Sequence, residues 1–232
     1  MDGRNLLRTL TSLGAQRLWG GVLPIRIMLA DDHVIVRQGL RYILEEEGFQ
    51  VVGEASNGQE AIRLAEQLCP EVAVLDVGMP LLNGIDATKE IVKASPRTKT
   101  ILLTMHSENH FVLNSLRAGA RGYLLKERAA EDLVQAVAEV IRGGIYLSPS
   151  ISRTVVQAYL TSTELNPDPL SVRERQVLQL VAEGNTSKDV ATILGISVKT
   201  AESHRNHIMD KLNIHDVAGL VRYAIRNGLI ES

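Results

Sequence analysis

EVAVLDVGMP, at Glu71–Pro80, is the stretch that decides the fold of this chain. Four consecutive apolar residues, from Val72 to Leu75, show no polar alternation. This pattern is typical of a central parallel strand covered on both faces. The run ends on Asp76, and Pro80 cannot continue a strand. A carboxylate at the carboxyl end of such a strand points into the crevice where open α/β sheets bind ligands. Taken alone, Asp76 is better explained as a solvated acid at a strand end, so the rest of the chain must decide its role.

Strand-like and helix-like segments alternate on both sides of this stretch. We expect strands at 25–30, 50–55, 72–76, 100–104 and 122–125, and helices at 34–47, 58–68, 85–94, 108–118 and 130–142. In the first helix, Val34, Leu40, Ile43 and Leu44 are expected to face inward. Strands that alternate with helices of about 10–15 residues indicate a parallel sheet with right-handed crossovers. The prediction is a doubly wound, five-stranded flavodoxin-like sheet.

Composition limits the classes of protein to which the chain can belong. Its 232 residues suffice for one large or two modest domains. No stretch approaches the roughly 18–20 apolar residues of a membrane span, so no membrane partner is expected. The single cysteine, Cys69, excludes an internal disulfide and a four-cysteine metal site. Its rarity fits a reducing interior, and we expect a cytoplasmic protein.

Charge and turn residues divide the chain into segments. Residues 25–147 hold 13 Lys and Arg against 17 Asp and Glu, a net of −4, whereas residues 170–232 hold 8 against 7, a net of +1. This weak asymmetry favours two domains with different partners. Between them, 148–169 contains three prolines and is expected to be a linker, in which 151–160 has the pattern of a helix. Residues 1–24 fit neither domain and are predicted to be a disordered extension.

Polar residues stand at the ends of four of the expected strands: Asp31, Asp32, Asp76, Thr104 and Lys126. Because the carboxyl ends of parallel strands meet at one edge of a sheet, these five side chains should converge. Three neighbouring carboxylates repel one another unless a cation neutralises them. Ligation by oxygen alone selects a hard ion, and Mg²⁺ keeps waters that a phosphate can replace. A hydroxyl and an ammonium nearby suit a transferred phosphoryl group.

The motifs LADDH, VLDVGMPLLNG, LLTMH and GYLLK make residues 25–145 resemble the receiver domain of a two-component response regulator. The resemblance implies roles for seven residues. Asp76 would be the phospho-acceptor, and Mg²⁺ would be held by Asp31, Asp32, Asp76 and the backbone carbonyl of Gly78. Thr104 and Lys126 would bind the phosphoryl oxygens. Tyr123 would swing inward on activation, although a plain core tyrosine is the alternative.

Residues 170–232 have the pattern of a small all-α domain of four helices. Gly184 favours a helix end, capping residues at 186–189 start a second helix, and Gly195 to Ser197 form a turn before a third helix at 198–212. A helix, a short turn and a helix indicate a helix-turn-helix, whose second helix enters the major groove. The expected DNA contacts are Lys188, Lys199, Thr200, Glu202, Ser203, Arg205 and Asn206. An ordinary solvated helix face is the alternative, since Glu202 and Asp210 lie on it too.

The sequence of this segment resembles the LuxR-type DNA-binding domain over its full length: PLSVRERQVLQLVAEGNTSKDVATILGISVKTAESHRNHIMDKL. Ala201 and Glu202 depart from residues that are usual in that family, which leaves base preference open. The two resemblances together imply a response regulator of the NarL/FixJ type. It would accept phosphate from a sensor histidine kinase, form a homodimer, bind an inverted repeat in promoter DNA and alter transcription. RNA polymerase is a further candidate partner.

Two other functions fit part of the pattern. A Mg²⁺-dependent phosphatase with an aspartyl nucleophile uses a similar sheet, but it leaves residues 170–232 unexplained, and the adjacent acids Asp31 and Asp32 do not match its usual spacing. A DNA-binding protein that ignores phosphorylation would not need the complete set of five strand-end residues. The resemblance implies a regulator and not an enzyme, one that would catalyse only its own Mg²⁺-dependent phosphorylation and dephosphorylation.

Overall fold

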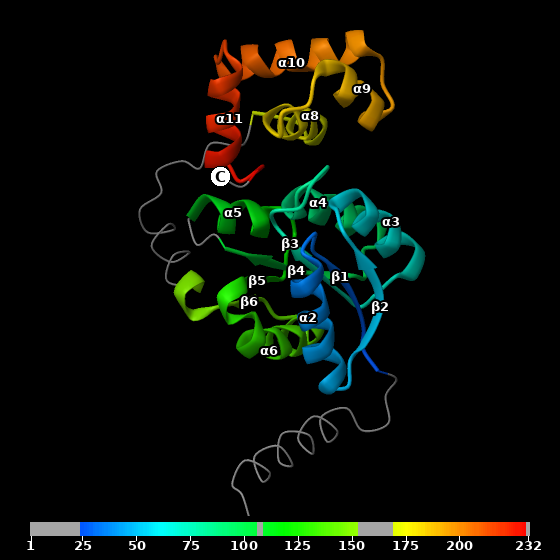
Figure 1. The fold of residues 1–232 in the computed structure, drawn as a ribbon. Helices are drawn as coiled ribbons and strands as arrows, with labels where there is room; N and C mark the ends of the chain where they lie inside the picture. Colours follow the sequence, from blue (N-terminus) through cyan, green and yellow to red (C-terminus); the bar gives the residue numbers. More distant parts are fainter. Residues whose placement is uncertain (1–23, 106–108, 153–168, 231–232) are drawn as a thin grey trace, which may run out of the picture.

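The computed structural model describes residues 24–105, 109–152 and 169–230, which form an α/β domain followed by a helical domain (Figure 1). The α/β domain contains a single parallel sheet in the order β2-β1-β3-β4-β5-β6. Its strands are β1 (Arg26–Ala30), β2 (Gln50–Ala55), β3 (Val72–Asp76), β4 (Lys99–Thr104), β5 (Gly122–Leu125) and β6 (Tyr146–Leu147). The predicted doubly wound sheet is confirmed. The expected strand number of five is wrong, because two-residue β6 is too short to show a periodic pattern.

Helices cover both faces of the sheet. They are α2 (Val34–Glu46), α3 (Gly58–Leu68), α4 (Gly84–Ala94), α5 (Asn109–Arg117) and α6 (Ala129–Ile141), with a short 3-10 turn at Lys126–Arg128. In β3, Leu75 packs into the cluster that contains residues of α3, α4 and α5. Its neighbour Val74 packs into the cluster that contains residues of α2 and α6. Successive strand residues point to opposite faces, and both faces are covered, which explains the unbroken apolar run of β3.

One prediction about α2 is wrong. Leu40 and Leu44 are buried as expected and Ile43 is partly buried, but Val34 is 55% exposed. Val34 is the first residue of α2, and the residue before it, His33, contacts the strand-end residue Asp31. The helix therefore begins at the carboxyl edge of the sheet, where its first side chain lies beyond the core that the later turns reach.

The helical domain consists of α8 (Val172–Ala182), α9 (Ser187–Leu194), α10 (Val198–Leu212) and α11 (Val217–Arg226). All four begin with a side-chain cap: Ser171, Thr186, Ser197 and Asp216 accept a hydrogen bond from a backbone N–H of the first turn. Their apolar faces form a separate core from that of the sheet. This confirms the predicted four-helix domain.

The helical domain packs against the sheet edge at which the predicted site lies. In Figure 1, α8 and the end of α11 lie nearest the α/β domain, and α10 lies on the far side. Leu81, in the loop after β3, packs against the core of the helical domain. Among the described residues, no helix is long and apolar enough to cross a membrane. Most of the expected linker helix at 151–160 lies outside the described residues, as does the predicted disordered extension up to residue 23.

Candidate functional site

The carboxyl ends of β1, β3 and β5 bring two carboxylates and an ammonium together. Lys126 Nζ lies 3.0 Å from Asp31 Oδ2 and 2.8 Å from Asp76 Oδ2. Both aspartates are only 1% exposed. Parallel pairing of β1 and β4 on either side of β3 produces this arrangement, because it aligns the strand ends. The predicted convergence of Asp31, Asp76 and Lys126 is therefore seen.

Asp32 and His33 complete an acidic cluster on the solvent side of this centre. Asp31, Asp32, His33 and Asp76 each offer a ligand atom, and these atoms lie within 4.8 Å of one another. His33 Nδ1 lies 3.0 Å from Asp32 Oδ1 and 3.3 Å from Asp31 Oδ1. The sequence analysis did not include His33 in the site. Its position directly after Asp31 and Asp32 was the available signal.

The donor atoms of this cluster fit a hard divalent cation. Within the described part of the chain, the buried Asp31 Oδ2 and Asp76 Oδ2 face the ammonium of Lys126, so one cation is shared between two carboxylates. Burial of an ionised carboxylate costs free energy unless enough positive charge or hydrogen bonds surround it, so two buried carboxylates favour a further cation. Asp31, Asp32 and Asp76 therefore form an acidic pocket that is compatible with metal binding.

Burial and charge act against each other on the two central groups. Burial raises the pKa of Asp76, and the charge of Asp31 raises it further, while hydrogen bonds from Lys126 and the Gly78 backbone oppose the rise. Burial lowers the pKa of Lys126, but its contacts with Asp76 and Asp31 outweigh this effect, so the pKa is raised overall. At neutral pH, Lys126 is therefore held in its charged form beside the two carboxylates.

Thr104 ends β4, Tyr123 lies in β5 and Gly78 follows β3 by two residues, so all three lie in or next to the strands around the acidic centre. Thr104 is 1% exposed. Leu103, the residue before Thr104, is the strand partner of Asp76. Tyr123 is fully buried, which fits a plain core tyrosine as well as the predicted switch. The Gly78 backbone contributes a hydrogen bond to Asp76. The inward swing of Tyr123 and the metal contact of the Gly78 carbonyl stay predictions.

The second candidate site is the outer face of α10. Five of the predicted DNA contacts on this face are exposed: Lys199, Thr200, Glu202, Ser203 and Asn206. Lys188 on α9 is exposed as well. Arg205 is half-buried, and its Nε is buried without a hydrogen-bond partner in the described residues. Ala201 and Ile208 are buried and hold α10 against the helical core. The face that remains is polar and open, as a groove-inserted helix requires.

Comparisons with known proteins identify both domains. Residues 27–138 match the response regulator receiver domain, and residues 168–224 match the bacterial regulatory proteins of the luxR family. The oxygen regulatory protein NreC of Staphylococcus carnosus is 38% identical over 216 residues, which cover 89% of this chain and all of NreC. The response regulator UvrY of Escherichia coli is 36% identical, over 88% of this chain and 95% of UvrY.

Solved structures show the same likeness. A structure of the response regulator RcsB in complex with DNA is 30% identical, with a TM-score of 0.56, over 88% of this chain and 99% of that chain. RcsB of Salmonella typhimurium, in a study of DNA interaction, is 31% identical with a TM-score of 0.56, over 87% of this chain and 98% of that chain. The receiver-type acidic centre, the helix-turn-helix and these full-length matches lead to one conclusion: the chain belongs to the NarL/FixJ-type two-component response regulators, transcriptional regulators with a receiver domain and a LuxR-type DNA-binding domain.

Proposed function

We propose that Asp76 accepts a phosphoryl group from a sensor histidine kinase and that this phosphorylation controls promoter binding by the helix-turn-helix. The receiver would comprise residues 25–147 and the DNA-binding domain residues 170–232, joined by the linker at 148–169. The observation that carries the proposal is the contact of Lys126 with both Asp31 and Asp76 at the ends of three parallel strands. It is the arrangement that an incoming phosphoryl group needs, with a carboxylate to attack and cations to spread charge.

In the proposed transfer, an Asp76 carboxylate oxygen attacks the phosphorus atom of a phosphohistidine. The new O–P bond forms as the P–N bond breaks, and the histidine leaves with the electron pair and takes up a proton. Lys126 and Thr104 would bind the phosphoryl oxygens. Asp31, Asp32, Asp76 and the Gly78 carbonyl would hold Mg²⁺, which would neutralise charge on the phosphoryl group. Attack by water on phosphorus would later restore Asp76, so the chain would catalyse its own phosphorylation and dephosphorylation.

On the output side, phosphorylation would favour a homodimer whose paired α10 helices bind an inverted repeat in double-stranded DNA. RcsB is known in a complex with DNA and as two dimers on two parallel DNAs, which supports this proposal. Lys188, Lys199, Thr200, Glu202, Ser203, Arg205 and Asn206 stay the proposed contacts. RNA polymerase as a partner and a cytoplasmic location stay predictions.

The decisive experiment is labelling by a small-molecule phosphodonor. Asp76→Asn should abolish acid-labile label without loss of fold, because the amide has the same shape but is a poor nucleophile. Glu66→Gln makes the same chemical change at an exposed residue of α3 and should label like the wild type. Labelling of the wild type should also require Mg²⁺. Label retained by Asp76→Asn, or labelling that ignores Mg²⁺ removal, would contradict the assignment.

A further inference from the structure

The backbone of Asp31 lies just beyond the last paired residues of β1 and β2. The ladder between these strands ends at the pair of Ala30 and Ala55. The Asp31 amide still donates to the Ala55 carbonyl, at 3.2 Å. The Asp31 carbonyl lies past the ladder, in a residue that is only 1% exposed. A buried carbonyl needs a hydrogen-bond donor, and here a side chain supplies it.

The donor is Arg37 of α2, which connects this carbonyl to β2. Its Nη1 donates to the Asp31 carbonyl at 2.5 Å, and its Nε donates to Glu54 Oε2 at 2.9 Å. The side chains of Arg37 and Glu54 are 15% and 28% exposed. Because the donors of a guanidinium point in fixed directions, a group held by Glu54 on one side presents its other side in a single direction. Both polar backbone groups of Asp31 are therefore held by the end of β2, one directly and one through Arg37.

Glu54 is itself held in its ionised form. Burial raises the pKa of Glu54, but its hydrogen bonds with Arg37 and Arg41 and the charges of both outweigh burial, so the pKa is lowered overall. Arg41 Nη1 lies 2.6 Å from Glu54 Oε1, the oxygen that Arg37 Nε does not contact. A partly buried network of several charges keeps its geometry better than an isolated surface pair. Arg37 is thus oriented by a carboxylate that stays charged at neutral pH.

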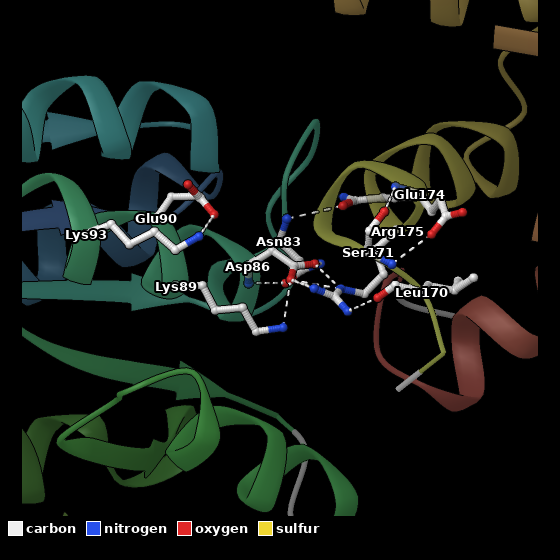
Figure 2. A network of polar contacts seen from close by, with 10 residues as sticks. Asn83, Asp86, Lys89, Glu90, Lys93, Leu170, Ser171, Glu174 and Arg175 are labelled. Carbon is white, nitrogen blue, oxygen red and sulfur yellow. Dashed lines mark hydrogen bonds and ion pairs between the residues drawn. The ribbon is translucent and has the colours of Figure 1, made fainter. Parts of the chain in front are cut away.

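Arg175 makes the same kind of contact in another part of the molecule. Its Nε lies 2.8 Å from Asp86 Oδ1, and a terminal nitrogen donates to the Leu170 carbonyl at 2.9 Å (Figure 2). An arginine of this kind fixes a main-chain carbonyl relative to a carboxylate on another element. In the case of Arg37, the carbonyl belongs to Asp31, a residue of the acidic pocket, so its position matters for the site.

The contact with Arg37 also determines how the chain enters Asp32. The Asp31 carbonyl and the Asp32 amide belong to one planar peptide group, so a donor that fixes the carbonyl fixes the amide as well. The Asp32 side chain is 33% exposed and lies 3.0 Å from His33, which is 58% exposed, so its own contacts hold it weakly. Ordering this residue in advance lowers the entropy that is lost when a ligand binds.

We propose that Arg37 is a positioning residue of the acidic pocket: through the Asp31 carbonyl, it holds Asp31 and Asp32 in the arrangement that binds a divalent cation. Glu54 acts on the pocket by orienting Arg37. The proposal rests on the proposed function, in which Asp31, Asp32 and Asp76 hold Mg²⁺. Charge alone has the opposite effect, because a guanidinium beside the pocket repels a cation. The sign of the change in Mg²⁺ affinity when Arg37 is replaced therefore separates positioning from charge.

A Mg²⁺ titration of the full chain without phosphodonor, followed by the amide chemical shift of Val77 beside Asp76, measures this affinity. Arg37→Met keeps an unbranched apolar stem, loses the donors, and should weaken Mg²⁺ binding by about tenfold, as is usual when a group that orients metal ligands is removed. Arg41→Met is the matched control, because Arg41 also contacts Glu54 but bonds to Glu45 where Arg37 bonds to Asp31. It should leave the affinity within about twofold of the wild type. Unchanged or tighter binding in Arg37→Met, or an equal loss in Arg41→Met, would overturn the proposal.

Arg37→Lys keeps the proposal testable if Arg37→Met does not fold. Lysine retains the charge, but a single ammonium cannot reproduce the two donor directions of the guanidinium. This variant should weaken Mg²⁺ binding by about threefold or more, and wild-type affinity would contradict the role of the guanidinium geometry. Glu54→Gln should weaken Mg²⁺ binding more in the wild type than in Arg37→Met, because Glu54 acts through Arg37. Equal effects in the two backgrounds would overturn the part assigned to Glu54.

Asp32→Ala separates this inference from the proposed function. It removes a carboxylate of the pocket itself and should weaken Mg²⁺ binding more than Arg37→Met does. If Asp32→Ala left the affinity unchanged, Mg²⁺ would bind elsewhere, and the proposed Mg²⁺ site would fail together with the role of Arg37. If Asp32→Ala weakened binding and Arg37→Met did not, the positioning role of Arg37 alone would be overturned.

Discussion

Lys126 stands between two buried carboxylates, and its charge opposes the protonation of Asp76 that burial favours. Burial raises the pKa of Asp76, and Lys126 opposes that rise. Because only the deprotonated carboxylate attacks phosphorus, labelling is lost as the pH falls through this pKa. Lys126→Met removes the opposing cation, so the pKa of Asp76 should rise further and the pH at which labelling is half-maximal should move upward.

The measurement is the initial rate of phosphodonor labelling as a function of pH. Lys126→Arg keeps the positive charge and is the control, so its pH profile should be close to that of the wild type. Its maximal rate should be lower, because the side chain has a different shape. A profile of Lys126→Met that coincides with the wild type, or that moves to lower pH, would contradict this account of the Asp76 pKa.

Glu174 gives a second pH prediction, in the helical domain. Burial raises the pKa of this carboxyl, but Lys211, at 2.8 Å, and hydrogen bonds that the carboxyl accepts from the backbone amide and the side chain of Ser171 lower it to about 2 from a reference value of 4.5. Because the pKa of Glu174 is lower in the folded than in the unfolded chain, the ionised carboxyl stabilises the fold at pH values above the unfolded pKa. This stabilisation is lost as the pH falls from about 4.5 toward 2. The Lys211 side chain is 44% exposed, so solvent weakens the pair and we expect a contribution on the order of 1–3 kcal/mol.

Hydrogen exchange of the α8 amides between pH 5 and 2, corrected for intrinsic rates, measures this loss. Glu174→Gln should remove the pH dependence within this window and lower the protection at pH 5. Glu202→Gln, at an exposed acid of the same domain, is the control and should retain the wild-type dependence. A Glu174→Gln chain that still loses protection in parallel with the wild type would show that another group is responsible.

At the scale of the element, α10 carries two kinds of predicted DNA contact. Lys199 is exposed near the start of the helix, where a long cation can neutralise one phosphate. Lys199→Ala should weaken all duplexes alike and reduce the slope of log affinity against log salt by about one unit. The measurement is a salt titration on a site selected from random duplexes and on mixed-sequence DNA. A loss confined to the selected site would contradict the role of phosphate anchor.

Asn206, also exposed on α10, is predicted to read a base, because its amide can bond to adenine at two atoms. Asn206→Ala should cost roughly 1–3 kcal/mol on the selected site and little on mixed-sequence DNA. His207→Ala, at the neighbouring exposed residue, is a suitable comparison. Equal losses on both kinds of DNA for Asn206→Ala would show that this position does not read sequence.

At the scale of the whole molecule, phosphorylation should increase dimer formation and DNA affinity together. Two half-sites bound by an existing dimer cost one association entropy instead of two. Sedimentation should show a higher dimer fraction with phosphodonor and Mg²⁺, and the gain in affinity should require two half-sites. The Asp76→Asn chain provides the control for both measurements. If dimer fraction and affinity ignored the phosphodonor in a chain that is labelled, the DNA-binding domain would act independently of its receiver.

The sequence by itself determined most of the local structure and the centre of the acidic site. The structure confirms the apolar run at β3, the alternation of strands and helices, and the capping residues of the helical domain. Each of these features depends on local periodicity or on backbone hydrogen bonding at a helix end. The proximity of Asp31, Asp76 and Lys126 could be predicted from the sequence because the carboxyl ends of parallel strands lie at the same edge of the sheet. His33 was missed although it follows Asp32, since a histidine after a strand is a weak signal on its own.

Only the tertiary structure decided how α8 is buried. The apolar residues Val177, Leu178, Leu180 and Val181 of α8 are buried, and the structure also buries Arg175 and Gln179. A helical pattern records which residues are apolar, and a buried arginine or glutamine is invisible to it until a partner is known. Their partners, Asp86, Met79 and Asn83, lie 89 to 100 residues away. The positive φ of Leu81 has the same cause, because packing against a second domain compensates a backbone cost that no local signal predicts.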